Sequence, residues 1–392
     1  LPSLPAFLIH EMAEFIARLR RYAHEAVLSV KAEIVANLSQ HTANFANGPL
    51  MLDVAFPGAA YFSVAAGGVA DVLHLLGEHV HVDRFIGASG GACSLFLILA
   101  NDKSVHSGSA GVCPNAEELI RSYLLYAESE GSGNWQRSWN ACRQMFGGVS
   151  TFWERRYEEL LQDERSWTAV RHRAFCAVSA RPIRQNIFGP PSESQDRFHC
   201  KKDNYIMHSF AVRNEAVQSF VATGEATFKG FVTGIPITRD VAWDPINQDE
   251  ASPQMTASRS QVKLPSSFCD GGHPVAFDSF LCPQNAAERQ KNFLLYYATW
   301  FENTSDCLLC SPESIERLYK RGVDRTIACL LSPSLMAQGS IADSKKDSMI
   351  IIASDANLEE EVCKIGKPGI LSGGTFVDLS RRELRQQTKQ NL

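Results

Sequence analysis

The longest amphipathic pattern in the chain lies near its beginning. Apolar side chains recur every three or four positions over residues 6–40, at Leu8, Met12, Phe15, Leu19, Tyr22, Ala26, Val30, Ile34 and Leu38. This period predicts one long helix with a single apolar face. Arg18, Arg20 and Arg21 flank that face, so a helix on a membrane surface is one interpretation and a helix packed on its own domain is the other. We favour packing, because most amphipathic helices face a core.

After Asn47-Gly48-Pro49 the pattern changes to short apolar runs that alternate with helical stretches. Leu50–Phe56 and residues 82–86 are predicted to be strands, and small and apolar residues at helical spacing lie between them. A strand, a helix and a strand within about 35 residues predict a right-handed β-α-β unit with parallel strands. The small residues of this helix are expected to let it lie close to a sheet.

Later segments continue the mixed α/β pattern. Strands are predicted at Ala174–Ala180, 326–331 and Met349–Ala353, helices at 92–100, 210–220 and 358–364, and loops at 189–203 and 246–263. Four tryptophans fall in one helical region, at Trp135, Trp139, Trp153 and Trp167. Two interpretations stay open for them: packing between helices, or a lid at about residues 105–170 that meets lipid.

Composition narrows the class of protein. The chain has 392 residues, of which 45% are hydrophobic and 21% charged, so a packed globular core is expected. A net charge of −5 with dispersed basic residues gives no reason to expect a nucleic-acid partner. The longest apolar run is far short of the ~20 residues that a membrane span needs. The oligomeric state stays open.

Cysteine usage indicates the compartment. The eleven cysteines are odd in number and irregular in spacing, which favours free thiols in a reducing compartment. Cys307 and Cys310 form a single C-x-x-C without a convincing second pair, so we expect no metal site. The protein is therefore expected to be intracellular, soluble or peripheral on membranes. Its first residue, Leu1, leaves a removed targeting peptide open.

One pentapeptide, Gly-Ala-Ser-Gly-Gly at positions 87–91, carries the strongest chemical signal. It follows a predicted strand and begins an apolar helix, which is the context of a nucleophile elbow with Ser89 at its tip. Gly87, Gly90 and Gly91 would allow the sharp turn, and the helix start would direct N–H groups at an anion beside the serine. The alternative is a glycine-rich loop that cradles a phosphate or only turns the chain.

An activated serine needs a base. The chain has no histidine after position 273, so the late histidine of an α/β-hydrolase triad is absent, and a histidine base would be His106, His172, His199, His208 or His273. The other candidate is Asp270, which ends a predicted strand and precedes Gly271 and Gly272. These two glycines would let the backbone approach the elbow closely, although an Asp-Gly turn is common.

Three blocks together resemble the signature of the patatin-like phospholipases: Gly58 after the first strand, the elbow at Ser89, and Asp270 with its two glycines. The residues from 56 to 73 are also similar in rhythm to the adipose triglyceride lipase branch of that family. The resemblance implies a three-layer α/β/α sandwich with a mostly parallel central sheet and a Ser89–Asp270 dyad without histidine. It also implies an oxyanion hole from the backbone of Gly58, Ala59 and Ala60.

Two departures from the family pattern concern the site. Ala59 and Ala60 follow Gly58 where the family has more glycine and often an arginine, and His273 follows the Asp-Gly-Gly where an asparagine is frequent. Alanine keeps an N–H, so these residues can still donate to an oxyanion.

The expected organisation has three parts: an N-terminal helical extension (1–48), a catalytic domain (49–335), and a C-terminal strand and helix with a basic tail (336–392). The expected activity is a lipid acyl hydrolase that cleaves fatty-acyl esters of glycerolipids at a membrane or lipid-droplet surface without metal or organic cofactor. The alternatives are an acyltransferase that uses the same acyl-enzyme, and a catalytically silent patatin-like scaffold.

Overall fold

The computed structural model describes residues 6–41, 49–56, 63–102, 112–129, 150–180, 204–224, 240–242, 261–263, 268–270, 292–297, 310–332, 349–353 and 375–378. The strands of the main sheet are β1 (Leu50–Phe56), β2 (Val80–Ala88), β3 (Ala174–Ala180), β4 (Asn204–His208), β7 (Phe268–Asp270), β8 (Asn292–Tyr297), β9 (Met349–Ala353) and β10 (Thr375–Asp378). The helices are α1 (Ala6–His41), α2 (Ala65–Leu76), α3 (Gly90–Leu99), α4 (Glu117–Ser129), α6 (Ser150–Leu160), α7 (Glu164–Arg173), α8 (Arg213–Thr223) and α11 (Pro312–Leu331).

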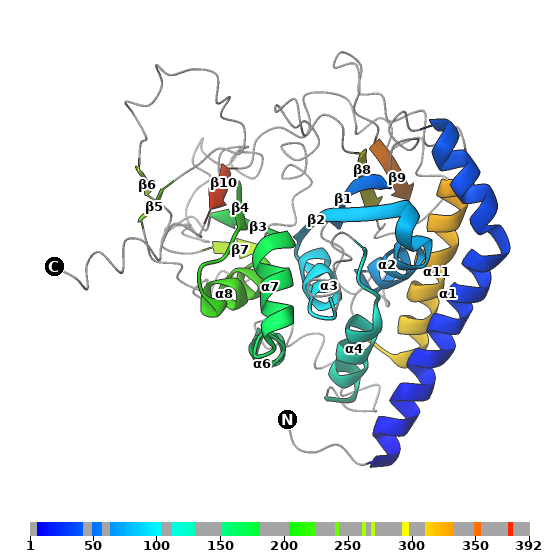
Figure 1. Ribbon diagram of the computed structural model, residues 1–392. Coiled ribbons are helices and arrows are strands. Elements are labelled where there is room, and N and C mark those ends of the chain that lie inside the picture. The colour runs from blue at the N-terminus through cyan, green and yellow to red at the C-terminus, as the bar shows by residue number, and fades with distance from the viewer. Residues whose placement is uncertain are drawn as a thin grey trace, which may run out of the picture.

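These elements form a mixed α/β fold with a mostly parallel open sheet (Figure 1). The strand order is β10-β4-β3-β2-β1-β8-β9, and β7 pairs with β3. All neighbours along this order are parallel except β3 and β4, and β7 is also antiparallel to β3. In Figure 1, α2, α3 and α8 lie on one side of the sheet, and α1 runs beside α11 at one end of it.

The predicted β-α-β unit is confirmed by β1, α2 and β2, whose two strands pair in parallel. Leu52, Val54 and Phe56 of β1 are buried, as a central parallel strand requires. Among the small residues of α2, Gly68 serves a contact with α11. A Cβ on Gly68 would lie 2.3 Å from the carbonyl oxygen of Tyr319, so the two helices touch backbone to backbone.

The long N-terminal helix is also confirmed, and α1 packs on its own protein. Met12, Ile16, Leu19, Ala23, Val27, Ile34 and Leu38 form its buried stripe. Polar side chains on α1 complete the contact: Lys31 donates to the carbonyl of Leu75 at the end of α2 (2.9 Å), and Asn37 donates to the carbonyl of Leu331 at the end of α11 (2.9 Å). The apolar face that a membrane-surface helix would insert is therefore already used inside the fold.

Two predicted segments are wrong. Residues 326–331 are helical and form the end of α11 instead of a strand. The polar stretch 246–263 ends in a short strand, β6 (Gln261–Lys263), which pairs with β5 (Asp240–Ala242). The predicted helix at 358–364 and the loop at 189–203 lie outside the described residues. No helix in the described ranges is long and apolar enough to cross a membrane.

The tryptophans that fall in described helices serve packing. Trp153 of α6 stacks on Tyr126 of α4, with ring centroids 5.3 Å apart, and Trp167 of α7 is buried as well. A lid tryptophan would present its ring to lipid, so these two do not fit that interpretation. Trp135 and Trp139 lie outside the described residues.

Candidate active site

Ser89 stands at the turn between β2 and α3, in the strand–turn–helix context that the sequence predicts. Its backbone has φ 51° and ψ −130°, a combination that non-glycine residues rarely adopt. Such a conformation costs on the order of 1–3 kcal/mol and persists only where the surrounding structure enforces it. Ser209 is the other non-glycine residue with positive φ in the described part, and it follows β4 outside any Gly-x-Ser-x-Gly context.

Gly87 makes the tight turn possible, as expected for a nucleophile elbow. A Cβ at this position would lie 2.6 Å from the Cα of Ala92 and 2.3 Å from Cδ2 of Leu95. The first of these atoms is backbone and cannot rotate away, so any side chain here would push α3 off the strand. Glycine at position 87 therefore keeps α3 close beneath Ser89.

Thr223 holds the elbow in place through its side-chain hydroxyl. No sequence motif indicated this residue. The Ser89 N–H donates to Thr223 Oγ1 at 2.8 Å, and the Thr223 hydroxyl donates to the carbonyl of Ala177 at 2.6 Å. Thr223 is the last residue of α8 and is fully buried. One hydroxyl thus ties the strained turn to β3, and we regard Thr223 as a positioning residue for Ser89.

Substituting Thr223 by valine keeps the shape of the side chain but removes both hydrogen bonds. Leaving a buried N–H without its acceptor costs about 1–3 kcal/mol in the strained elbow, which lets Ser89 leave its position. With Ser89 as the proposed nucleophile, we expect kcat to fall about tenfold to a hundredfold with little change in KM. Thr223→Ser keeps the hydroxyl and is the matched control, with near wild-type turnover expected. A wild-type kcat for a folded Thr223→Val protein would refute this positioning role.

The backbone register brings Asp270 to the same place on the sheet as Ser89. β2 pairs with β3 as far as Ala88 opposite Ala177, and β7 pairs with β3 at the next position, Asp270 opposite Val178. β4 occupies the other edge of β3 at that point. Hence β2 and β7 lie along one edge of β3 with their carboxyl ends meeting, and Asp270 is a neighbour of the elbow despite its distance in sequence.

Backbone donors for an oxyanion lie at the start of α3. The carbonyl of Ser89 already accepts from Ala92 and Cys93, at 3.0 and 3.2 Å. Within the described ranges, the N–H groups of Gly90 and Gly91 make no hydrogen bond, as is normal for the first turn of a helix. They carry the positive end of the helix dipole to the side of Ser89.

The expected oxyanion residues Gly58, Ala59 and Ala60, like Gly271 and Gly272, lie outside the described residues. Ser63, at the start of the next described segment, is anchored to α3 and α4. The Ser94 hydroxyl donates to the carbonyl of Ser63 at 2.8 Å, and the Ser63 hydroxyl lies 2.8 Å from that of Tyr123. All three side chains are buried, so α3 and α4 fix the start of α2 relative to the elbow.

Other nucleophiles and bases in the described part are poorly placed for the same chemistry. Cys93 lies one turn after Ser89, but burial raises the pKa of its thiol to about 12, which keeps it protonated and unreactive. Cys93, Cys113, Cys176, Cys310 and Cys329 are buried free thiols.

Two of the histidines considered as bases lie far from the elbow. His172 is in the last turn of α7, before the amino end of β3, and burial lowers the pKa of its imidazole. His208 is opposite Phe175 and stacks on that ring with centroids 4.9 Å apart. Both therefore lie about 10 Å or more from the carboxyl end of β2, given the rise and spacing of strands. His106, His199 and His273 lie outside the described residues.

Comparison of the chain with protein-family models, with curated proteins and with solved structures gives no match. The functional assignment therefore depends on the residues of the chain itself and on the geometry around Ser89.

Proposed function

We propose that this chain is a serine acyl hydrolase of the patatin-like type, which cleaves fatty-acyl esters of glycerolipids through Ser89 and Asp270. The observation that carries the proposal is the strained Ser89 between β2 and α3, together with the register that ends β7 at Asp270 beside it. A backbone strain of this size at a loop tip is typical of a catalytic residue. The full three-layer sandwich of that family is part of the proposal.

The proposed chemistry follows an acyl-enzyme route. Asp270 accepts the proton of the Ser89 hydroxyl as its oxygen attacks the ester carbonyl, and the tetrahedral oxyanion forms beside the N–H groups of Gly90 and Gly91. Collapse of this intermediate breaks the ester bond, and Asp270 returns the proton to the departing alcohol. Asp270 then takes a proton from water, which attacks the acyl-enzyme. As the bond between the acyl group and Ser89 Oγ breaks and the fatty acid leaves, Asp270 returns that proton to Ser89 Oγ.

The oxyanion donors are expected to contribute strongly. Loss of one preorganised donor typically costs about 3 kcal/mol in the transition state. We propose that the backbone N–H groups around Gly58, Ala59 and Ala60 complete the oxyanion hole. The hydrogen bonds of Ser63 to α3 and α4 support this role, because they hold the chain that follows the turn in one position.

A panel of lipid esters tests the proposal. Wild-type protein and Ser89→Ala are assayed side by side on a phospholipid, a galactolipid and a triacylglycerol, with release of fatty acid as the measurement. We expect the wild type to release fatty acid from at least one class and Ser89→Ala to release none. Equal release by the two proteins would refute the proposal.

The same panel separates the related activities. If added lipid alcohols receive the acyl group faster than water does, the protein is an acyltransferase that uses the same acyl-enzyme. If no lipid turns over and no serine-directed reagent reacts, the protein is a silent scaffold.

A further inference from the structure

A pocket of about 450 Å³ lies between α1 and α4, formed by residues that take no part in the elbow. The apolar part of its lining consists of Ala13, Ile16 and Ala17 on α1. The rest of the lining is mainly basic: Arg20, Arg21 and His24 come from α1, and Glu117 and Arg121 come from α4. The pocket thus joins an apolar surface to a set of cationic donors, which is the composition that suits an anionic ligand with an apolar part.

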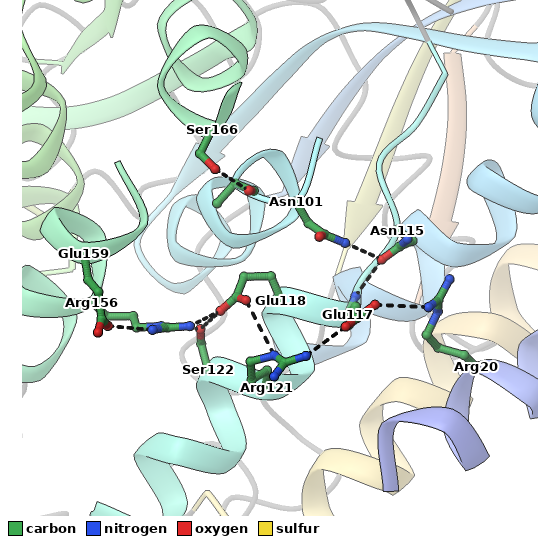
Figure 2. A network of polar contacts seen from close by, with 11 residues as sticks. Arg20, Asn101, Asn115, Glu117, Glu118, Arg121, Ser122, Arg156, Glu159 and Ser166 are labelled. Carbon is green, nitrogen blue, oxygen red and sulfur yellow. Dashed lines mark hydrogen bonds and ion pairs between the residues drawn. The ribbon is translucent and has the colours of Figure 1, made fainter. Parts of the chain in front are cut away.

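The carboxylate of Glu117 is shared by two of the arginines. Arg20 lies 3.3 Å from one oxygen of Glu117 and Arg121 lies 2.8 Å from the other, as Figure 2 shows. Arg121 also approaches Glu118 at 3.7 Å, but Glu118 is paired with Arg156 of α6. One carboxylate therefore faces two guanidinium groups, and the pocket keeps an excess of positive charge.

Arg21 adds to that excess. Its side chain is exposed and, within the part of the chain that the structure describes, makes no hydrogen bond or ion pair. Arg18, on the same helix, is in contrast paired with Glu316 of α11 at 2.7 Å. With three guanidinium groups and one carboxylate in its wall, the pocket carries two net positive charges before any contribution from His24.

We propose that this pocket is an anion-binding site that takes a phosphate group, and that the apolar portion of the ligand lies against Ala13, Ile16 and Ala17 of α1. A guanidinium presents paired N–H donors in a plane that matches phosphate oxygens, so arginines gathered around a cavity favour this ligand. The Arg20–Glu117–Arg121 cluster also preorganises the site, because Glu117 holds both guanidinium groups against the wall. The same chemistry is offered by a phospholipid headgroup and by free phosphate.

Isothermal titration of the full-length protein with two probes tests the site. One probe is inorganic phosphate, and the other is a short-chain dialkyl ether phosphatidic acid, which has no ester for Ser89 to cleave. We expect the ether lipid to bind, and its affinity to fall as salt rises. The corresponding dialkylglycerol without phosphate should not bind. Equal binding of inorganic phosphate and of the ether lipid would support the site with a free anion as its ligand.

Three variants make the test specific. Arg21→Glu should weaken binding of the ether lipid about tenfold or more, because it reverses a charge that has no structural partner in the described chain. Arg155→Glu, an identical charge change at an exposed position of α6, is the matched control and should leave affinity unchanged. Ala17→Phe fills the apolar part of the pocket without altering its charge and should abolish binding of the ether lipid.

Two results would overturn the proposed site. If neither probe binds to the wild type, the cluster only ties α1 to α4. If Arg21→Glu and Arg155→Glu lose the same affinity for the ether lipid, the attraction is unspecific. Ser89→Ala should bind the ether lipid as tightly as the wild type does. The test of this site is therefore independent of the test of the proposed hydrolase activity.

Discussion

Ser89→Ala and Asp270→Asn are each expected to lower turnover of glycerolipid esters by about four orders of magnitude or more, with the fold intact. In the proposed mechanism, attack by Ser89 and proton transfer to Asp270 occur in one step, so neither group works without the other. The register around β3 supports this pairing, since the carboxyl ends of β2 and β7 meet at one edge. The double variant should be no worse than either single one, because members of one catalytic unit are not additive.

His273 is the control for this prediction. It lies three positions after Asp270, close enough in sequence for its imidazole to be taken for the base. His273→Ala should keep most of the activity. If His273→Ala is as inactive as Asp270→Asn while circular dichroism shows a native fold, the base is the histidine and the dyad assignment is wrong.

Gly322→Ala is expected to cost about 3 kcal/mol or more in the free energy of unfolding. A Cβ at this position of α11 would lie 2.0 Å from the carbonyl oxygen and 2.9 Å from the carbonyl carbon of Ala65 on α2. Both atoms are backbone, so relief requires the two helices to separate. Alanine has the higher helix propensity by about 1 kcal/mol, which alone would stabilise the protein. We expect the steric conflict to outweigh this gain, so the net effect is a loss of stability.

Urea unfolding followed by circular dichroism measures this effect, and Gly224→Ala is its matched control. The nearest atom to a Cβ on Gly224 is the Val221 carbonyl oxygen at 3.5 Å, and its φ of −82° suits any residue. We expect Gly224→Ala to change stability by no more than about 0.5 kcal/mol. A Gly322→Ala protein as stable as the wild type would show that α2 and α11 do not pack in the manner described.

Local sequence patterns were sufficient where one signal dominates. The strands β1 and β3 have the predicted bounds, Leu50–Phe56 and Ala174–Ala180. Each was predicted from a short apolar run. The elbow was also predictable, because a Gly-x-Ser-x-Gly pattern after a strand predicts a tight turn, and Gly87 leaves room for α3. In each case the pattern that predicts the element lies within a few consecutive residues.

Residues 326–331 show where this reasoning fails. Their apolar run fits a strand as well as the end of a helix, since periodicity cannot separate the two over so few positions. The missed signal lies upstream: Ser311 and Ser314 form a capping box, and Pro312 occupies the first turn of α11. Read from that start, Ile315, Leu318 and Tyr319 form the buried face of one long helix.

The support of the candidate site was beyond the sequence for a different reason. Thr223 contacts Ser89 only because α8 ends against β3, and no spacing in the sequence encodes that meeting. The juxtaposition of Asp270 with the elbow likewise depends on β7 joining the same edge of β3 as β2. Sequence could name the two residues but not the strand that brings them together.

The most direct test of the central claim is covalent labelling of the folded protein with a fluorophosphonate, followed by intact-mass measurement and peptide mapping. The account predicts one adduct, on Ser89, in the wild type and in His273→Ala, and no adduct in Ser89→Ala. Labelling of Ser209, the other described serine with positive φ, or persistence of the adduct in Ser89→Ala would contradict it.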